Sequence, residues 1–343
     1  MNIRTIRKTA ALLVLGLAAI AAPSHAIDIT DQRGRTISFD APPQRVVMLP
    51  IPGPATFIAI DRSERKIVGM NAHAASAMRE GFLGRMFPGF AKISTNVVMA
   101  GADPSNFTPN VESILALRPD VVFQWANAAG GDSIAVLDRT GLPALGMQVG
   151  SQEENAGFIA LRGRVAGNEA RAADLIGRQA EVRRRIEAVV SRVPDLPRPR
   201  VIYFNRAAQL LRVAGGRSHN DFYIRLAGGQ NAAAEIQTAN TVTIEQVLTW
   251  NPEVILLGNF DAAVPSDLYD DPRWQSVDAV RNRRVYKMPL GGYRWDPPSQ
   301  ESALTWIWLA GLLHPELEHA NLRAAMREWF SFLYKHDLTD DEI

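Results

Sequence analysis

The sequence contains no cysteine. This absence excludes disulfides, thiolate metal sites, cysteine nucleophiles and a lipid-modified N-terminal cysteine. A run of lysines and arginines with interleaved aromatic residues is also missing, so the electrostatic footprint of a nucleic-acid-binding protein is absent. A chain of 343 residues can form a core large enough to be stable without disulfides. We therefore expect a globular protein that does not bind nucleic acid.

Signatures of catalysis are lacking as well. The sequence has no HExxH motif and no glycine-rich nucleotide-binding loop, and its histidines are scattered. The segment from Gly216 to Asn220 resembles a nucleophile elbow around Ser218, but it has Asn where the motif requires its last Gly. We therefore expect that the protein is not an enzyme and has no resident cofactor or metal. A hydrolase that depends on Ser218 is the alternative.

A long apolar run occurs only near the N-terminus. Three basic residues precede the run from Ala10 to Ala22, and residues 23–26 end in small side chains where a signal peptidase cleaves. This order predicts a secretory signal peptide over residues 1–26, cleaved after Ala26; an N-terminal membrane anchor is the alternative. Removing this segment takes away three basic and no acidic residues, so the formal net charge falls from +1 to −2. Without a lipid anchor, we expect a periplasmic protein.

Short apolar runs alternate with longer helical patterns along the rest of the chain. Such runs are typical of parallel strands in α/β units; they cover residues 46–49, 121–123, 144–147, 201–204, 254–257 and 285–288. Residues 168–193 keep apolar positions at helical spacing between many charges, and the prolines of residues 194–199 end that helix. We predict two doubly wound α/β lobes with parallel sheets, over 27–167 and 200–343, joined by one long backbone helix and linker over 168–199.

An internal repeat supports two lobes. Residues 111–123 (VESILALRPDVVF) match residues 244–256 (IEQVLTWNPEVIL), each position lying 133 residues after its counterpart. Each copy predicts a short helix, a proline that ends it, an acidic residue and a buried strand. A chance match between two α/β units is the alternative.

The chain resembles the periplasmic binding proteins that carry ferric siderophores, haem and cobalamin to ABC importers. The resemblance lies in the order of four segments: RVVMLPIPGPATFIAI (45–60), NVESILALRPDVVFQW (110–125), TIEQVLTWNPEVILLG (243–258) and HPE (314–316). It implies two α/β lobes joined by a long helix, which capture a metal chelate and deliver it to a membrane permease. It also implies that Glu112 and Glu245 meet arginines of that permease. The alternative is that each glutamate only stabilises the first turn of its helix.

Candidate ligand-binding residues follow the predicted strands, because parallel α/β sheets bind ligands beyond the carboxyl ends of their strands. Aromatic faces and guanidinium groups suit a flat or anionic solute. The candidates are Trp125, Arg217, His219, Tyr293, Arg294, Trp295 and, with less support, His73. We expect a monomeric binding protein for a metal chelate of the ferric siderophore, haem or cobalamin type. An oxyanion such as molybdate, or a bare metal ion held by His73 and His219, is the alternative.

Overall fold

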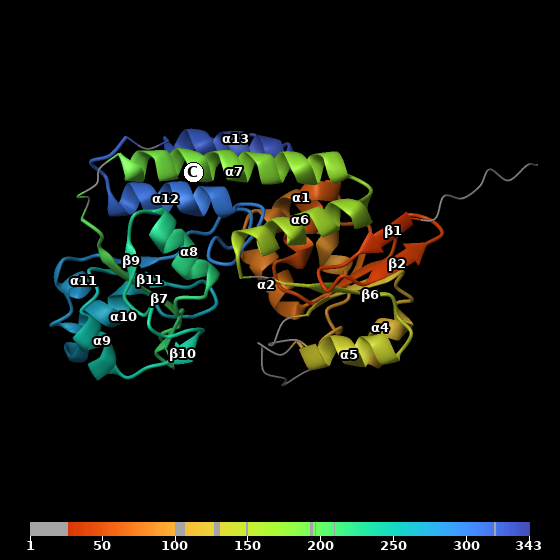
Figure 1. The fold of residues 1–343 in the computed structure, drawn as a ribbon, viewed down its shortest axis with the longest axis horizontal. Coiled ribbons are helices and arrows are strands. Elements are labelled where there is room, and N and C mark those ends of the chain that lie inside the picture. Colours follow the sequence, from red (N-terminus) through yellow and green to blue (C-terminus); the bar gives the residue numbers. More distant parts are fainter. Residues whose placement is uncertain are drawn as a thin grey trace, which may run out of the picture.

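The computed structural model describes residues 27–343, except 100–106, 127–130, 149, 193–194, 196, 209 and 319. The predicted signal peptide, residues 1–26, lies outside the described residues. Two α/β lobes stand side by side beneath a long helix in Figure 1. The predicted architecture of two α/β lobes is confirmed.

The first lobe is built on a four-stranded parallel sheet in the order β4-β3-β5-β6. Its strands are β3 (Val46–Met48), β4 (Ile67–Met70), β5 (Val121–Trp125) and β6 (Ala144–Met147), and an antiparallel hairpin of β1 (Ile27–Thr30) and β2 (Thr36–Phe39) precedes them. Three of these strands coincide with predicted apolar runs; β4 was not predicted. All five residues of β5 are buried, as expected for a parallel strand covered on both faces.

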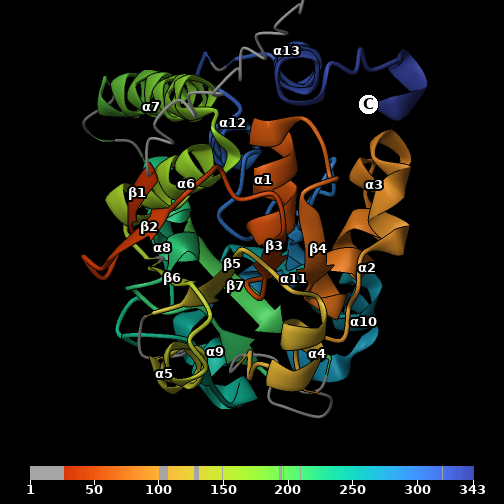
Figure 2. The ribbon, with the colours of Figure 1, turned by 90° about the vertical axis from the view of Figure 1, so that its right-hand side faces the viewer.

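Helices cover both faces of this sheet. Towards the long helix lie α1 (Gly53–Asp61) and α6 (Gln152–Ala166), and on the opposite face lie α4 (Val111–Ala116) and α5 (Gly131–Arg139). At the edge are α2 (Ala72–Glu80), α3 (Leu83–Met86) and η1 (Pro88–Lys92). Figure 2 shows this lobe from its outer side. Alternate residues of β3 enter different cores, because successive side chains point to opposite faces of a strand: Val46 packs with α1, and Val47 packs with Ile114 of α4.

The second lobe has a mixed sheet in the order β10-β8-β7-β11-β12, with β9 beside β7. Its strands are β7 (Arg200–Arg206), β8 (Arg212–Val213), β9 (Gln230–Asn231), β10 (Asn240–Thr241), β11 (Val254–Leu257) and β12 (Val285–Lys287). Strands β7, β11 and β12 are parallel, as predicted; β9 is a parallel strand that was not predicted, and β8 and β10 are antiparallel additions. The connection between β7 and β8 is too short for the crossover of a dozen residues that a parallel pair requires.

The helices of this lobe also lie on two faces. Those nearer the long helix are α8 (His219–Leu226), α12 (Ser302–Leu313) and α13 (Leu322–Tyr334); those on the far face are α9 (Ile244–Trp250), α10 (Pro265–Asp270) and α11 (Asp278–Arg281), with η2 (Pro272–Trp274) between the last two. The short η3 (Asp340–Glu342) ends the chain. Trp306, Trp329 and Phe330 are buried in the core, and Trp308 is partly buried against it.

The predicted joining helix is α7 (Glu169–Ser191), which runs along one side of both lobes in Figure 1. It packs against α6 of the first lobe and against α8 and α12 of the second. A single apolar cluster beneath it contains Val46 and Met48 of one sheet together with Val201 and Tyr203 of the other. The two lobes therefore share one core on this side.

The internal repeat has the same local structure in both lobes. Asn110 caps α4 and Thr243 caps α9, each side chain accepting a hydrogen bond from the backbone N–H three residues later. Both helices end in a left-handed residue before a proline, at Arg118 (φ 45°) and Asn251 (φ 40°). These shared details argue against a chance match of sequence.

In each lobe, the acidic residue of the repeat binds the backbone of an arginine at the start of a central strand. Glu253 accepts a hydrogen bond from Arg200 N at 2.9 Å, and the Arg200 guanidinium donates to Asn251 O, also at 2.9 Å. In the first lobe, Asp120 accepts from Arg45 N at 2.8 Å, and Arg45 donates to Leu117 O at 2.7 Å. Together, the acidic residue and the arginine attach the end of the repeat helix to β3 in the first lobe and to β7 in the second.

Arg171 fastens α7 to the helices beneath it. Its guanidinium donates to Ala59 O at 2.8 Å and to Leu333 O at 2.9 Å, and it lies over the ring of Phe332, 4.7 Å from the ring centroid. Burial lowers its pKa to about 10. The residue therefore supplies donors to the last carbonyl groups of α1 and α13, which the helices themselves leave unpaired.

We expect Arg171→Ala to lower the free energy of unfolding by about 2–4 kcal/mol, because it leaves these carbonyl groups unpaired and removes the contact with Phe332. Urea unfolding measures the change. Arg184→Ala is the matched control: Arg184 is on the same helix, its side chain is 71% exposed, and its loss is expected to cost less than about 0.5 kcal/mol. Equal effects of the two changes would contradict this role of Arg171.

Candidate functional site

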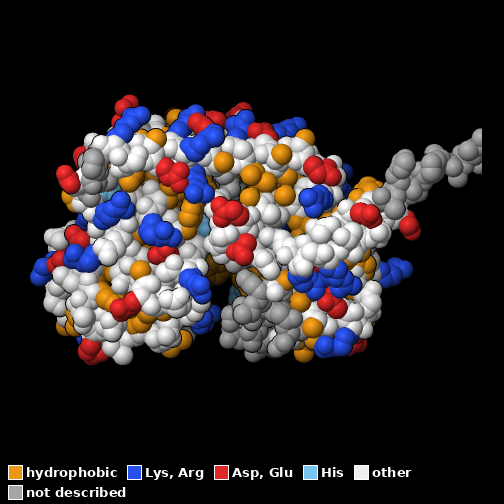
Figure 3. Space-filling view, viewed as in Figure 1, with side chains coloured by type: hydrophobic (Ala, Val, Ile, Leu, Met, Phe, Trp, Pro, Cys, Tyr) orange, Lys and Arg blue, Asp and Glu red, His pale blue; other side chains and the backbone are white. Residues whose placement is uncertain are grey.

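The carboxyl ends of strands from both sheets meet between the lobes. The loop after β12 reaches the first lobe, where Tyr293 Oη donates to Ile51 O at 3.0 Å, directly after β3. Phe82 N and Leu83 N donate to Gly291 O and Gly292 O, each at 3.0 Å. A Cβ atom at Gly81 would lie 2.4 Å from Gly292 O, so the close approach of the two lobes requires glycine at position 81. Figure 3 shows the surface hollowed between the lobes, on the side away from α7.

A buried carboxylate organises the loop after β12. Glu301 accepts hydrogen bonds from Tyr293 N at 3.1 Å and Trp295 Nε1 at 2.8 Å, and Tyr334 Oη also donates to it. Burial raises the pKa of Glu301 to about 7, although these hydrogen bonds oppose the shift. The two donors from the loop fix its conformation around the carboxylate, and the hydrogen bond from Tyr334 attaches the carboxylate to α13.

The predicted ligand residues of this loop are engaged with the protein. Tyr293 is 0% exposed and Trp295 is 2% exposed. Arg294 forms an ion pair with Glu80 of α2 at 2.6 Å and lies over the ring of Phe260, 4.5 Å from its centroid. These contacts bind the loop to the first lobe. Ligand contact by the three residues stays a prediction, and it would require these side chains to move.

Trp125 belongs to a stack of three side chains behind the cleft. It is 7% exposed and stacks on Phe158 of α6, with ring centroids 6.0 Å apart and planes 12° apart. The guanidinium of Arg162 also lies over the Phe158 ring, 3.4 Å from its centroid. Contact of Trp125 with a ligand stays a prediction, because its ring is largely covered.

Arg162 is buried without a counter-charge. It is 0% exposed, and no carboxylate among the described residues forms an ion pair with it. Its Nε donates to Gly53 O at 3.2 Å and its Nη1 to Phe158 O at 2.7 Å, whereas Nη2 has no hydrogen-bond partner. Burial lowers its pKa well below the ordinary value. An isolated buried cation is costly unless an anion pairs with it.

The unpaired guanidinium lies at the start of α1. A Cβ atom at Gly53, the first residue of that helix, would lie 3.1 Å from Arg162 Nη2. The start of α1 itself has few free donors, because Gly53 N donates to Pro50 O at 3.0 Å, Thr56 N donates to Pro52 O at 3.3 Å, and the proline between them has no N–H. The guanidinium therefore provides the unpaired donor after β3, at the carboxyl edge of the first sheet. An anion that accepts a hydrogen bond from Nη2 would supply its missing counter-charge.

His219 of the second lobe contacts a buried side chain of the first lobe. It begins α8, and its Nδ1 lies 3.2 Å from Asn155 Nδ2 of α6. The imidazole stacks on Phe222 and is 8% exposed. Burial lowers the pKa of His219 to about 4, so the ring is neutral at pH 7. Asn155 Oδ1 is buried and unpaired; a ligand donor would satisfy it.

The other two cleft candidates are exposed. Arg217 lies in the turn before α8, and His73 lies in the first turn of α2, where Asn71 caps the helix. His73 belongs to the first lobe and His219 to the second. In the described parts of the chain, no group of three or more His, Asp or Glu side chains could hold a metal ion. Ligand contact by Arg217 and His73 stays a prediction.

Glu112 and Glu245 lie in the first turns of α4 and α9 and are exposed. Neither forms an ion pair within the part of the chain that the structure describes. A hydrogen bond from the side chain of Thr243 lowers the pKa of Glu245. Each glutamate therefore lies where a negative charge stabilises the start of its helix. Both carboxylates remain accessible to solvent.

The sequence interpretation missed Arg162, Asn155 and Glu301. Arg162 gave a signal: it follows Phe158 by four residues and precedes Val165 by three, on the apolar face of α6. A single arginine on such a face is unusual, because charged side chains are rarely buried without a partner. Asn155 and Glu301 gave no comparable signal.

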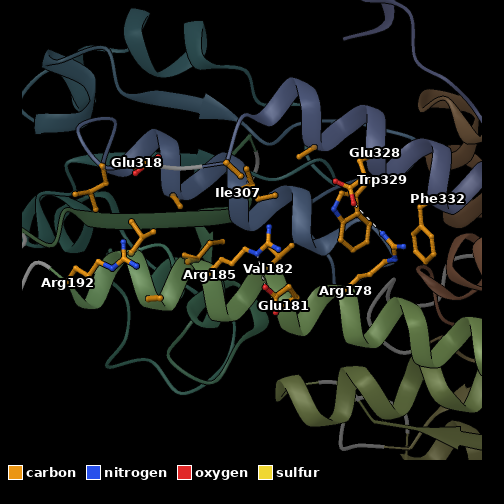
Figure 4. A pocket seen from close by; sticks show the side chains of 17 residues that line it. Arg178, Glu181, Val182, Arg185, Arg192, Ile307, Glu318, Glu328, Trp329 and Phe332 are labelled. Carbon is orange, nitrogen blue, oxygen red and sulfur yellow. Dashed lines mark hydrogen bonds and ion pairs between the residues drawn. The ribbon is translucent and has the colours of Figure 1, made fainter.

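A second hollow lies away from the cleft. Figure 4 shows a groove of about 730 Å³ between α7 and the pair α12 and α13, lined by Arg185, Trp329 and Phe332 among others. None of the predicted ligand residues lines it. The cleft and this groove therefore lie on opposite sides of the shared core.

Comparison with known proteins identifies relatives across most of the chain. Residues 104–290 match the family model described as periplasmic binding protein. The molybdate-binding protein MolA of Haemophilus influenzae is 26% identical over 336 residues, which cover 91% of this chain and 92% of that protein. Its structure with molybdate has a TM-score of 0.77, at 23% identity, over 91% of this chain and 99% of that one.

Two further proteins are similar. A periplasmic solute binding protein from Veillonella parvula is 30% identical with a TM-score of 0.80, covering 92% of this chain and 95% of that chain. The vitamin B12-binding protein of Vibrio parahaemolyticus is 24% identical over 185 residues, 52% of this chain and 63% of that protein. In the described residues, no helix is both long and apolar enough to span a membrane.

The pKa of His219 predicts a pH dependence of stability. Because its folded pKa of about 4 lies below the unfolded value of about 6.5, the unfolded chain binds the proton more tightly. This group therefore lowers the free energy of unfolding as the pH falls from about 6.5 to 4, by roughly 3 kcal/mol.

His219→Gln should remove that part of the acid destabilisation, since the amide does not titrate. Urea unfolding of both proteins between pH 7 and pH 4 measures the difference. The matched control, His73→Gln, changes an exposed histidine and should follow the wild type. Parallel pH curves for wild type and His219→Gln would show that His219 titrates normally.

Proposed function

This chain belongs to the family of periplasmic binding proteins, and from this premise we propose that it captures an anionic solute between its lobes for an ABC importer. Proteins of this family are periplasmic, bind small-molecule ligands and deliver them to ABC permeases. The proposal includes export by a signal peptide cleaved after Ala26, action as a monomer, and no catalytic role.

The buried, unpaired guanidinium of Arg162 carries the assignment of an anion. The solute would accept a hydrogen bond from Arg162 Nη2, and the exposed Arg217 of the second lobe would add a second positive charge when the cleft closes. Charge-assisted hydrogen bonds of this kind are the strongest that proteins make. The anion would supply the counter-charge that Arg162 lacks.

A small oxyanion of the molybdate type fits these features best. Tyr293, Trp295 and Trp125 are covered by protein, so they support a large flat ligand less than their sequence positions did. The neutral imidazole of His219 can donate one hydrogen bond to an oxygen of a small oxyanion. The similarity to MolA over nearly the whole chain supports the same solute class.

A metal chelate of the ferric siderophore, haem or cobalamin type is the second candidate. The similarity to the vitamin B12-binding protein favours it, and the hollow between the lobes in Figure 3 opens to solvent. Chelates with carboxylate groups would also pair with Arg162. A chelate would have to displace Tyr293, Trp295 or Trp125 to use their rings.

Isothermal titration with molybdate tests the solute class, with a ferric siderophore, haem and cobalamin titrated in parallel. We expect molybdate to bind and Arg162→Met to weaken it by about tenfold to a hundredfold, the loss of one or two charge-assisted hydrogen bonds. The variant should stay folded, because replacing a buried unpaired charge by an apolar side chain of similar volume is often neutral or stabilising.

Arg162→Lys is the matched control, since it keeps the charge and should bind more tightly than Arg162→Met. Binding of a chelate without molybdate would transfer the assignment to the second candidate. Unchanged molybdate affinity in a folded Arg162→Met variant would show that another group holds the anion.

Glu112 and Glu245 are the proposed contacts with the permease. Carboxylates on both lobes can orient the binding protein over a pore, because complementary charges steer and align partners. The double reversal Glu112→Lys/Glu245→Lys should leave solute affinity unchanged and abolish solute uptake by cells, measured in a strain that lacks the wild-type protein. The control reversal Glu187→Lys changes an exposed glutamate on α7 and should not affect uptake. Loss of solute affinity in the double variant would contradict the docking role.

A further inference from the structure

Two exposed leucines occupy equivalent positions of the internal repeat. Leu115 of α4 is 47% exposed and Leu248 of α9 is 36% exposed. The two leucines are 133 residues apart, and each follows the exposed glutamate of its helix by three residues. Single exposed leucines are ordinary, but the same exposed leucine in both lobes points to a shared use.

The helices place each leucine beside its glutamate. Residues three apart are neighbours on a helix surface, so Glu112 lies next to Leu115, and Glu245 lies next to Leu248. The inward positions are filled by Ile114 in α4 and by its counterpart in α9, Val247, both 0% exposed. The leucines are therefore not required by either core.

Both helices are held in the same way. The caps at Asn110 and Thr243 fix where the helices begin, and the arginines of the preceding strands bind the carbonyl groups at their ends. Neither helix contains a basic residue. Each lobe therefore presents the same rigid pair, one carboxylate beside one apolar side chain.

The two repeat helices lie on the same side of the molecule. In Figures 1 and 2, α4 and α9 lie at the ends of their lobes farthest from α7. The hollow between the lobes opens on this side in Figure 3. A partner that covers the mouth of the cleft can contact both pairs at once.

We propose that Leu115 and Leu248 are apolar anchors for the membrane permease, each entering an apolar hollow beside the cationic group that meets the neighbouring glutamate. This inference rests on the proposed delivery to an ABC importer. Because the two pairs have the same chemistry, the partner surface has two equivalent halves. The glutamates provide long-range steering, which salt screens, and the leucines provide burial that salt does not weaken.

Binding of the purified protein to right-side-out inner-membrane vesicles from the source bacterium tests this inference. Leu115→Ser/Leu248→Ser should raise the half-saturating protein concentration about tenfold or more and leave its salt dependence unchanged. Glu112→Gln/Glu245→Gln should weaken binding at low salt and remove most of the salt dependence, because neutral amides do not attract the cationic groups over long range. Solute affinity and thermal midpoint should stay close to the wild type in both variants, because all four side chains are exposed.

Leu210→Ser is the matched control: Leu210 is 45% exposed and lies outside both helices, so vesicle binding should be unchanged. If the glutamate variant loses binding and the double serine variant binds as the wild type does, the leucine anchors are wrong and the proposed delivery stands. If the wild type does not bind the vesicles, the proposed delivery itself fails. Dissociation of a wild-type dimer by the serine changes, seen in sedimentation velocity, would assign the leucines to self-association and overturn the inference.

Discussion

The shared apolar layer beneath α7 is the constraint on which the rest of the structure depends. Val46 and Met48 of one sheet and Val201 and Tyr203 of the other belong to the same cluster, together with Trp306 of α12. Burying this layer holds the two lobes together on the side of α7. The hollow between the lobes opens on the opposite side, where α4 and α9 lie.

Some buried polar groups at the base of the cleft have hydrogen-bond partners, and others have none. Glu301 accepts hydrogen bonds from two donors of the loop after β12 and from Tyr334 of α13, and the same loop binds the first lobe through Tyr293. Arg162 and Asn155 instead keep buried polar atoms without partners. Unsatisfied buried groups are costly and therefore rare outside functional sites. This contrast supports the proposal of a solute site next to α1 and α6, and it assigns the aromatic loop to the joint between the lobes.

The repeat combines two roles in one short segment. Its acidic residue, Asp120 or Glu253, is used locally to hold the preceding strand. Its glutamate stabilises only the first turn of its own helix, its leucine belongs to neither core, and both are exposed. Each lobe therefore carries the same surface pair of one carboxylate and one apolar side chain.

Sequence alone determined the two α/β units, the joining helix and the repeat, because each depends on periodicity and residue type within short segments. It also indicated which loops meet at the cleft, but not which of their side chains are free. That was decided by contacts between distant segments: Tyr293 is bonded to Ile51, 242 residues away, and Arg294 to Glu80, 214 residues away. Arg162 acquired its importance in the same way, since only the packing of α6 against α1 buries its charge and leaves it without a partner.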